Sequence, residues 1–476
     1  MRSYDLIVIG AGAGGLTVAK GAAAFGATVA LVEKKSHIGG DCLHYGCIPS
    51  KTLVELAKKV HDIHANAKGF GLEAEGQLNL SIIMEHVQDV ITHFHTIEED
   101  SNLIDLGIDL YKGHASFVTE HQIEIDRKQR INGKRFVIAT GSSPIIPDIK
   151  GIENTPHYTN ETIYQLDKVP NRLVVIGGGP TNLELGQCFA RFGSDVTILD
   201  EAKTFLAQQD EEIALALRDR LTEEMSIHTN SLVVEIEELD VEKKVKFLKD
   251  GNLETIVADE VLVGVGRQAN TSNIGLNEIG VQLDNVHNVL VNPYLQTSKP
   301  HIYAIGDVHG KFCFSHAAGV EGKVVVQNAV LGLKKKIRYD NIPYTFYTDP
   351  EIFHIGMTEK EAIKKYGKHN VGVLNVQAAE IDRFITSGDE KGFVKVIISK
   401  RGKILGAQAI GKHADDWMQA LVFAKTKKYR VGALSTVVYP YPSNTGILQA
   451  VGDTYWRQKF HTKWSKWMKR YTQIFR

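Results

Sequence analysis

Two cysteines, Cys42 and Cys47, lie five positions apart in the segment GGDCLHYGCIPSK, residues 39–51. Cysteines at this spacing can form a small disulfide, and a cysteine at the start of a helix has a lowered thiol pKa. One sulfur of such a pair can exchange electrons with a neighbouring redox group while the other exchanges with a substrate. Two alternatives are open, a pair of buried structural cysteines or half of a metal site. No second cluster of Cys and His has the spacing to complete a zinc site, so we expect no metal ligands here.

The cysteine segment follows a strand–turn–helix–strand unit that occupies residues 4–34. In its glycine cluster Gly10 permits a tight turn, Gly12 lets a pyrophosphate approach the backbone, and Gly15 lets the helix pack on the strand. The second strand ends in Glu33, which can accept hydrogen bonds from ribose hydroxyls. We therefore predict a dinucleotide on this unit, bound at the helix N-terminus. The alternative is a packing turn without a ligand.

A second unit of the same pattern occupies residues 172–201, with Gly177 and Gly179 in the turn and Asp200 at the end of the second strand. Asn182 stands where the third glycine of the pattern is expected, so the fit between helix and strand is modified. A carboxylate at Asp200 suits free ribose hydroxyls and repels a 2′-phosphate, which favours NADH over NADPH. Two units of one pattern predict two dinucleotide sites.

Composition excludes several classes of protein. The formal net charge of −1 argues against a polyanion-binding role, so we expect no nucleic-acid partner. Four cysteines among 476 residues do not make a secreted disulfide framework. No apolar run approaches the roughly 18 residues of a membrane span, and the first strand begins too early for a signal peptide. A chain of this length forms about three domains, and we expect it in the cytoplasm.

These motifs together resemble the pyridine nucleotide–disulfide oxidoreductases, class I flavoenzymes that include dihydrolipoamide dehydrogenase and mercuric reductase. The resemblance covers nearly the whole chain. The segments that carry it are GAGAGG at 10–15, GGDCLHYGCIPSK at 39–51, ATGS at 139–142, GGGPTNLELG at 177–186, GR at 266–267 and AIGDV at 304–308.

The resemblance implies FAD on the first unit and NAD(P)H on the second. Cys47 matches the cysteine nearest the flavin, and Cys42 matches the interchange thiol that meets the substrate. Lys51 matches a lysine at the flavin's reactive edge, Glu184 matches its glutamate partner, and Asp307 matches the aspartate that binds the ribityl chain. The remaining positions that we expect to contact the cofactors are Gly14, Ala115, Thr140, Gly141, Gly266 and His316.

The expected fold is α/β, with two Rossmann-like dinucleotide-binding domains and a C-terminal α+β dimerisation domain of a homodimer. Disulfide-reducing members of the family carry a His-Pro and a following Glu in the C-terminal domain, and that His is the acid–base group. Here Tyr441 stands at the His position and Gly446 at the Glu position. The domains expected are FAD-binding at 1–150 and 271–342, NAD(P)-binding at 151–270, dimerisation at 343–454 and a basic aromatic tail at 455–476.

The sequence thus predicts hydride transfer from NAD(P)H to FAD and on to a Cys42–Cys47 disulfide and an unidentified small-molecule or metal-ion acceptor. Tyr441 looks like the Pro-Tyr of mercuric reductase, although no cysteine follows Cys313 to collect a metal ion. The alternatives are dithiol oxidation of the dihydrolipoamide dehydrogenase type, a low-turnover flavin redox sensor, and a membrane-associated quinone reductase. The last depends on residues 455–476, whose aromatic and basic residues suit either an anionic membrane surface on the inner face or a helix packed on the protein.

Overall fold

The computed structural model describes residues 2–72, 76–97, 99–240, 242–460 and 471–474. The chain forms two compact units. The first comprises Met1–Glu201 and Ser226–Ile337, and the second comprises Ala202–Met225 and Arg338–Arg476. Each unit is described by itself below.

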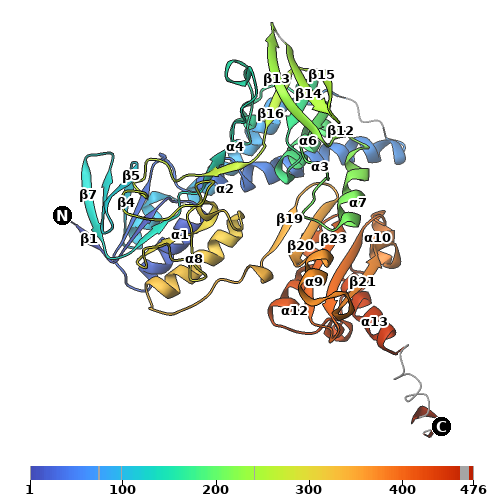
Figure 1. Cartoon of the computed structure of the whole chain (residues 1–476). Helices are drawn as coiled ribbons and strands as arrows, with labels where there is room; N and C mark the ends of the chain where they lie inside the picture. The colour runs from blue at the N-terminus through green and yellow to red at the C-terminus, as the bar shows by residue number, and fades with distance from the viewer. Residues whose placement is uncertain (1, 73–75, 98, 241, 461–470, 475–476) are drawn as a thin grey trace. The chain divides into compact units, whose positions relative to one another are not determined.

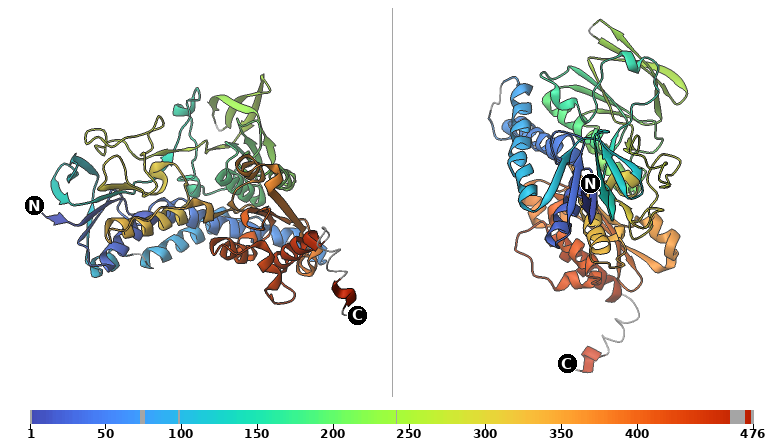
Figure 2. Two further views of the ribbon diagram at one scale, coloured as in Figure 1. Left: turned by 60° about the horizontal axis from the view of Figure 1, so that its bottom comes forward. Right: turned by 90° about the vertical axis from the view of Figure 1, so that its left-hand side faces the viewer.

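A five-stranded parallel sheet forms the core around the first glycine turn. Apolar runs such as Leu6–Ile9 build it because both faces of a parallel sheet are buried. Helices α1 (Ala13–Ala24) and α8 (Ser315–Ala329) pack against each other beside it, dark blue and gold in Figures 1 and 2. In spatial order the strands are β18 (Ile302–Ala304), β8 (Phe136–Ile138), β2 (Leu6–Ile9), β3 (Val29–Glu33) and β4 (Ile108–Lys112).

A second, mixed sheet in the same unit pairs the first residues of the chain with a β-meander. Strands β5, β6 and β7 pair antiparallel with one another, and β1 pairs with β7 in parallel. The four strands are β1 (Ser3–Tyr4), β7 (Gln129–Gly133), β6 (Gln122–Ile125) and β5 (Ala115–Thr119).

Helices fill the stretch between the first two parallel strands and β4. The short helix α2 (Gly40–His44) and the start of α3 (Cys47–Gly69) carry the cysteine segment. Helix α3 packs against α4 (Leu80–Ile97), and α5 (Asp100–Asp105) leads into β4. The cysteines therefore lie at the junction of two helices directly after the first strand pair.

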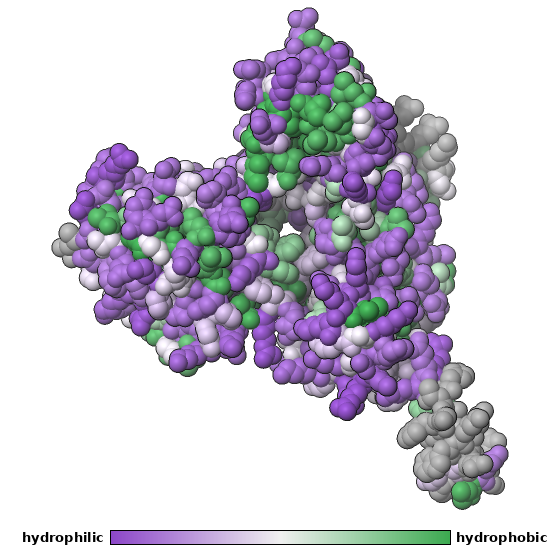
Figure 3. Space-filling model, in the orientation of Figure 1, coloured by the Kyte–Doolittle hydropathy of each residue, from purple (hydrophilic) through white to green (hydrophobic). Residues whose placement is uncertain are grey.

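The second glycine turn lies in a four-stranded parallel sheet with α6 (Pro180–Phe192). An antiparallel meander follows, and Figure 3 shows apolar side chains gathered over it. Leu232, Leu239 and Leu253 of the meander are exposed. The strands are β12 (Ser226–His228), β11 (Asp195–Leu199), β10 (Arg172–Ile176) and β16 (Glu260–Val263) in the sheet, β13 (Ser231–Leu239), β14 (Glu242–Lys249) and β15 (Asn252–Ala258) in the meander, and the antiparallel pair β9 (Ser142–Pro144) and β17 (Arg267–Ala269).

The second unit is an antiparallel sheet with helices, the α+β texture that the sequence predicts. Buried Lys395 forms ion pairs with Asp210, Glu212 and Glu359, which tie α7 and α9 to the sheet. The strands in spatial order are β19 (Pro343–Phe346), β20 (Glu351–Gly356), β23 (Ile404–Gly411), β22 (Phe393–Ser399) and β21 (Val371–Gln377), and the helices are α7 (Glu211–Leu221), α9 (Glu359–Tyr366), α10 (Asp382–Ser387), α11 (Ala414–Trp417), α12 (Gln419–Thr426) and α13 (Gly446–Phe460).

Candidate active site

Cys42 and Cys47 lie on consecutive helices and are both free, half-buried thiols. Cys42 is in α2, and Cys47 is the first residue of α3. The Cys47 Sγ is 3.2 Å from the Oγ of Ser315, the first residue of α8. A chain segment 268 positions away thus contributes a hydroxyl to the sulfur at the start of α3.

The surroundings of the two thiols shift their pKa values in opposite directions. A hydrogen bond from the Cys42 thiol, a hydrogen bond with Ser315 and the positive charge of Lys51 lower the pKa of Cys47, although burial opposes them. The same hydrogen bond, together with burial, raises the pKa of Cys42. These contacts therefore favour ionisation of Cys47 over ionisation of Cys42.

Lys51 and Glu184 form an ion pair between α3 and α6. The Lys51 Nζ is 2.6 Å from Glu184 Oε2, and the glutamate side chain is only 3% exposed. Because a buried carboxylate is costly without a cation, the pair fixes the lysine one helical turn beyond Cys47. The structure thus brings together the two residues that the family resemblance pairs.

The first glycine turn has the shape of a pyrophosphate cradle. Gly10 has φ of +103°, and a Cβ there would lie 2.3 Å from the Ala139 carbonyl oxygen. A Cβ on Gly15 would lie 1.9 Å from the Gly10 carbonyl oxygen, whereas the space beside Gly12 is open to 3.8 Å. Glu33 Oε2 accepts a hydrogen bond from the Ala11 amide at 2.7 Å and so fixes the turn. These residues fit the FAD of the family, with its pyrophosphate at the N-terminus of α1.

A polar network joins three of the sequence motifs to the cysteine segment. Ser142 Oγ donates to Asp307 Oδ2 at 2.7 Å, and Arg267 Nε donates to Ser142 Oγ at 2.7 Å. Arg267 Nη2 is also 3.1 Å from Asp41 Oδ1. The network connects the ends of β9 and β17 and the turn after β18 to the residue preceding Cys42.

The other residues expected to contact FAD surround the same turn or lie in neighbouring strands. Thr140 Oγ1 donates to the Asn270 carbonyl at 2.7 Å, and Gly141 and Gly266 have φ of +69° and +150°. Ala115 is the buried first residue of β5, and His316 is the exposed second residue of α8. Gly14 lies in the first turn of α1, where a Cβ would be 3.0 Å from Ile305.

The second glycine turn is built around Asn182 and Asp200. The Asn182 amide nitrogen lies 2.8–3.1 Å from the carbonyl oxygens of Ile176, Gly177 and Gly264. A Cβ on Gly178 would meet the Asp200 carboxylate at 2.4 Å, while nothing lies within 4 Å of one on Gly179. The open backbone beside Gly179 and the carboxylate across the turn fit the pyrophosphate and ribose of a nicotinamide dinucleotide.

Tyr441 is a surface residue of the second unit. Its side chain is 83% exposed, and its hydroxyl donates to Asp382 Oδ2 at 2.7 Å. The carboxylate raises the pKa of Tyr441, because it stabilises the protonated hydroxyl. Val438 nearby is 92% exposed. A catalytic part for Tyr441 stays a prediction.

The tail that the sequence sets apart begins inside a packed helix. Helix α13 runs to Phe460, Tyr455 is 5% exposed, and the Trp456 indole donates to the Gly432 carbonyl at 3.0 Å. Tyr455, the first residue of the expected tail, thus packs on the protein, while residues 456–460 are exposed. Residues 461–470 and 475–476 lie outside the described residues. No helix among the described residues is long and apolar enough to cross a membrane.

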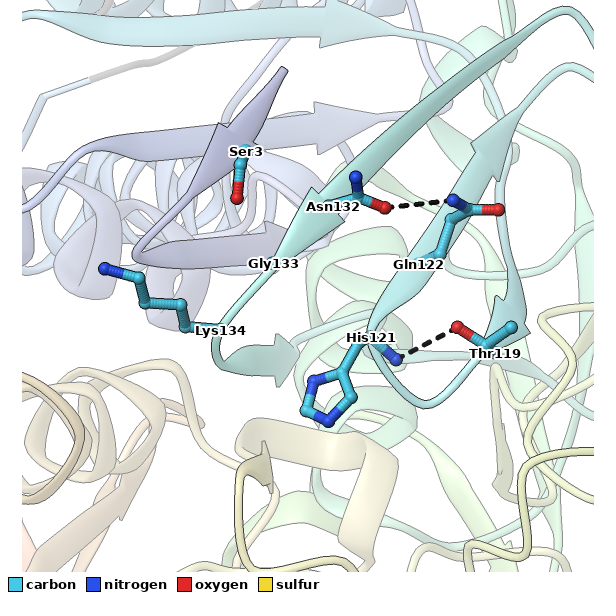
Figure 4. A pocket seen from close by; sticks show the side chains of 7 residues that line it. All are labelled: Ser3, Thr119, His121, Gln122, Asn132, Gly133 and Lys134. Carbon is cyan, nitrogen blue, oxygen red and sulfur yellow. Dashed lines mark hydrogen bonds between the residues drawn. The ribbon is translucent and has the colours of Figure 1, made fainter. Parts of the chain in front are cut away.

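Ser315 is a functional candidate that motif reading missed, whereas Ser142 and Arg267 lie in the segments ATGS and GR without having been singled out there. Ser315 contacts Cys47 across 268 positions of sequence, Ser142 contacts Asp307 across 165, and a serine has no spacing signal of its own. A surface pocket on the mixed sheet contains none of the predicted site residues (Figure 4). Its lining residues are Ser3, Thr119, His121, Gln122, Asn132, Gly133 and Lys134.

The chain matches two models of one protein family. Residues 4–330 match the pyridine nucleotide-disulphide oxidoreductase model, and residues 342–450 match the dimerisation domain of the same family. The chain therefore belongs to the pyridine nucleotide-disulphide oxidoreductases.

Its relatives carry different activities. A mercuric reductase of Bacillus cereus is 33% identical over 442 residues, 92% of this chain and 69% of that protein. A dihydrolipoyl dehydrogenase of Thermus scotoductus is 33% identical over 468 residues, 97% of this chain and 99% of the other. The Cu(II) complex of the HOCl-induced flavoprotein disulfide reductase RclA from Escherichia coli superposes with a TM-score of 0.84 at 26% identity, covering 95% of this chain and 99% of the other.

Membership of the family confirms the expected fold class and the expected type of enzyme. The chain is an oxidoreductase of a family whose members use FAD and NAD(P)H and a redox-active disulfide, and it carries a dimerisation domain. The electron acceptor is not fixed by the family, since relatives of equal identity act on different substrates.

Proposed function

We propose that this enzyme passes electrons from NADH, through FAD and the Cys42–Cys47 pair, to a soft or borderline metal ion such as Hg(II) or Cu(II). The observation that carries the proposal is the environment of Cys47. Its sulfur is hydrogen-bonded to Ser315 and lies in the field of Lys51, so its thiol pKa is lowered. A stabilised thiolate beside a protonated thiol is the form in which a dithiol can both donate electrons and bind a soft metal.

Each residue of the site then has a defined task. Bound FAD supplies the two-electron relay between nicotinamide and sulfur. Cys47 is the sulfur that receives the electrons, and Cys42 meets the acceptor. With Hg(II) the balance is NADH + Hg(II) → NAD⁺ + H⁺ + Hg(0), and with Cu(II) it is NADH + 2 Cu(II) → NAD⁺ + H⁺ + 2 Cu(I). In neither case does a thiol leave, and no proton must be delivered to sulfur. Lys51, held by Glu184, keeps positive charge near the Cys47 thiolate.

Tyr441 supports a metal acceptor over a dithiol or disulfide. The hydrogen bond to Asp382 raises its pKa, so it keeps its proton near neutrality and cannot alternate between acid and base. Thiol substrates require such a group, whereas metal ions do not. Mercuric reductases are among the relatives, and the similar RclA structure holds Cu(II). Dihydrolipoamide oxidation is the second candidate, favoured by the equal identity to the Thermus relative.

An anaerobic titration tests the acceptor. The holoenzyme is reduced with one equivalent of NADH, its absorption spectrum is recorded, and Hg(II), Cu(II), lipoamide or a quinone is added. We expect a long-wavelength thiolate–flavin band that Hg(II) or Cu(II) discharges with sustained NADH oxidation. Discharge by lipoamide or quinone alone would contradict the metal assignment and leave the dithiol relay intact. Bleaching of the flavin without the band would contradict the relay itself.

Asp200 supports the preference for NADH. Its carboxylate lies against the second glycine turn, where it would repel a 2′-phosphate. We expect Asp200→Ser to lower kcat/KM for NADH about tenfold and to raise the ratio of NADPH to NADH activity, since a hydrogen bond to a charged group contributes about 1.5–3 kcal/mol. Asp195→Ser, at the exposed start of β11, is the matched control. Equal loss with both nucleotides would show that Asp200 does not discriminate between them.

The assembly and location that we propose follow the family. The enzyme would be a cytoplasmic homodimer, with FAD on residues 1–150 and 271–342, the nicotinamide on 151–270 and the dimer contacts on 343–454. The basic residues beyond Asp453, seven Lys or Arg and no acid, favour contact with an anionic membrane as a secondary location. Cosedimentation with phosphatidylserine vesicles measures this, and equal recovery of a chain ending at Phe460 would rule it out.

A further inference from the structure

Three histidines from separate parts of the sequence meet beside the redox helix. His44 is in α2, two residues after Cys42, and His95 is in the last turn of α4. His37 precedes α2. Their ring centroids are 4.9 Å apart for His44 and His95, 5.1 Å for His37 and His95, and 6.2 Å for His37 and His44. His44 and His95 are half-buried and His37 is exposed, so the cluster opens to solvent.

We propose that His37, His44 and His95 form a binding site for a borderline transition-metal cation of the copper class, next to the redox-active cysteines. Imidazole nitrogens suit copper, zinc and nickel, and Cu(II) binds most tightly of the divalent series. Binding of the cation stands on the geometry of the three rings. Only its onward delivery to Cys42 rests on the proposed function, where the site would take the place of the C-terminal cysteines that this chain lacks.

The hydrogen bonding of His44 leaves a ring nitrogen available for a metal. Its Nε2 is 2.9 Å from the Ile38 carbonyl oxygen. A carbonyl oxygen can only accept, so Nε2 carries the proton and donates, and the Nδ1 of the neutral ring bears a lone pair. A backbone carbonyl that holds the opposite N–H is the usual outer-shell partner of a metal-binding histidine. Ile38 therefore presets the tautomer of His44 that a metal needs.

His95 provides the second nitrogen, and its distance from His44 Nδ1 can be compared with that between two ligands of one ion. His95 Nε2 is 3.4 Å from His44 Nδ1. Two nitrogens bound at about 2.0–2.1 Å in a tetrahedral site lie about 3.3–3.4 Å from each other. The same separation is long for a hydrogen bond between two rings, whose usual N···O or N···N distance is about 2.9–3.0 Å. Two of the three ligands thus lie at the separation of a tetrahedral site, and tetragonal Cu(II) would draw the two nitrogens together to about 2.8–3.0 Å.

His37 supplies the third nitrogen after a rotation of its side chain. Its ring is stacked on His95 at an interplanar angle of 18°, and no group of three metal-ligating side chains is preformed among the described residues. Because the His37 side chain is exposed, turning its ring toward the other two meets little resistance. Lys35, whose Nζ is 4.3 Å from the Tyr45 ring centroid, opposes a cation here, and the Glu33 carboxylate favours it.

Copper binding to the oxidised holoenzyme tests the site without the thiols. In this form Cys42 and Cys47 are joined as a disulfide, and Cys313→Ser removes the exposed thiol. Cu(II) is titrated without NADH and followed by electron paramagnetic resonance. We expect one Cu(II) per subunit with hyperfine coupling to imidazole nitrogen. His95→Ala and His37→Ala should each weaken the affinity by about tenfold or more, the loss typical of a removed partner in a metal site.

His93→Ala is the matched control, because it removes an exposed histidine from the same helix two residues from His95. It should leave Cu(II) affinity unchanged. Flavin content reports folding, and if His95→Ala loses its FAD, then His37→Ala, in an exposed loop, decides the question. Equal affinity for wild type, His95→Ala and His37→Ala would overturn the site, as would a Cu(II) signal without nitrogen coupling.

The two proposals fail separately. Cu(II) bound by the three histidines without any metal-dependent NADH oxidation would keep the site and refute the metal acceptor. Metal-dependent turnover with unchanged Cu(II) affinity in both histidine variants would keep the metal acceptor and refute the histidine site. If both hold, His95→Ala should raise the KM for Cu(II) while kcat at saturating Cu(II) stays within about twofold, because the site gathers the ion and does not perform the transfer.

Discussion

At the scale of single residues, the reactivity of Cys47 arises from three neighbours that different helices provide. Cys42 donates a hydrogen bond, Ser315 forms another at 3.2 Å, and Lys51 adds positive charge. Each stabilises the thiolate more than the thiol, and together they outweigh burial, which acts in the other direction. Ionisation of Cys47 is thereby favoured over ionisation of Cys42.

Replacing Ser315 should weaken the Cys47 thiolate. In Ser315→Ala the hydrogen bond to sulfur is lost, so the pKa of Cys47 rises toward its ordinary value. A hydrogen bond to a charged group contributes about 1.5 kcal/mol, which corresponds to about one pKa unit. As pH falls, the thiolate–flavin band of the NADH-reduced variant should therefore disappear at a higher pH than in the wild type.

The control for this titration is Ser194→Ala, which removes a buried serine hydrogen bond to the Pro170 carbonyl of the same unit. Its titration curve should coincide with that of the wild type. Coincident curves for Ser315→Ala and wild type would show that the Ser315 hydroxyl does not stabilise the thiolate.

The Lys51–Glu184 pair also has a structural effect that a mutant can measure. Lys51→Met removes the ammonium that lies 2.6 Å from a carboxylate with only 3% exposure. We expect the free energy of unfolding to fall by about 3 kcal/mol, the usual cost of breaking a buried pair from one side. The double variant Lys51→Met/Glu184→Gln should recover most of it, measured by denaturant unfolding of the FAD-bound protein. Equal instability of the single and double variants would contradict a dominant electrostatic cause.

At the scale of elements, the local turns could be predicted from sequence and the long-range contacts could not. Gly10 and Gly15 lie within six positions of each other, so the strand–turn–helix pattern alone is enough to predict their roles in the turn. Ser315 and Cys47, by contrast, meet only because α8 packs beside the sheet, and no periodicity encodes that meeting. The packing of α4 against α2 and α3 likewise brings His95 to His44. Because these two histidines lie far apart in the sequence, their spacing there does not indicate a metal site.

Asn182 shows how a departure from the glycine pattern is accommodated. Its amide bridges three carbonyl oxygens around the turn between β10 and α6, and Gly264 provides the room, since a Cβ there would lie 2.2 Å from Asn182 Oδ1. The missing third glycine is thus compensated by a second glycine on the neighbouring strand end. The turn keeps its shape through side-chain hydrogen bonds where other dinucleotide-binding turns use close backbone packing.

Restoring the family glycine should therefore harm the protein. We expect Asn182→Gly to lower the free energy of unfolding by about 1–3 kcal/mol, because buried carbonyl groups lose their donor. The KM for NADH should rise or stay constant, measured at saturating acceptor. Gly264→Ala should be at least as destabilising through its clash with Asn182, whereas Gly193→Ala, whose Cβ meets nothing within 4 Å, reports the cost of a positive φ alone. Greater stability of Asn182→Gly would contradict this account of the turn.

At the scale of the whole molecule, the exposed segment around Tyr441 is best explained by a second subunit. Val438 is 92% and Tyr441 83% exposed, and large apolar groups so exposed on one chain mark an interaction surface. The segment belongs to the part of the chain that matches the family's dimerisation domain.

We expect Val438→Glu to weaken the homodimer by about 100-fold, about 2.7 kcal/mol, because a charge would be buried at the contact. Sedimentation velocity over a concentration series measures the shift, and NADH-dependent turnover should fall with the dimer fraction. Val286→Glu, an equally apolar-to-acidic change at a residue 64% exposed in the first unit, should leave both unchanged. A fully dimeric and active Val438→Glu protein would place the subunit contact elsewhere.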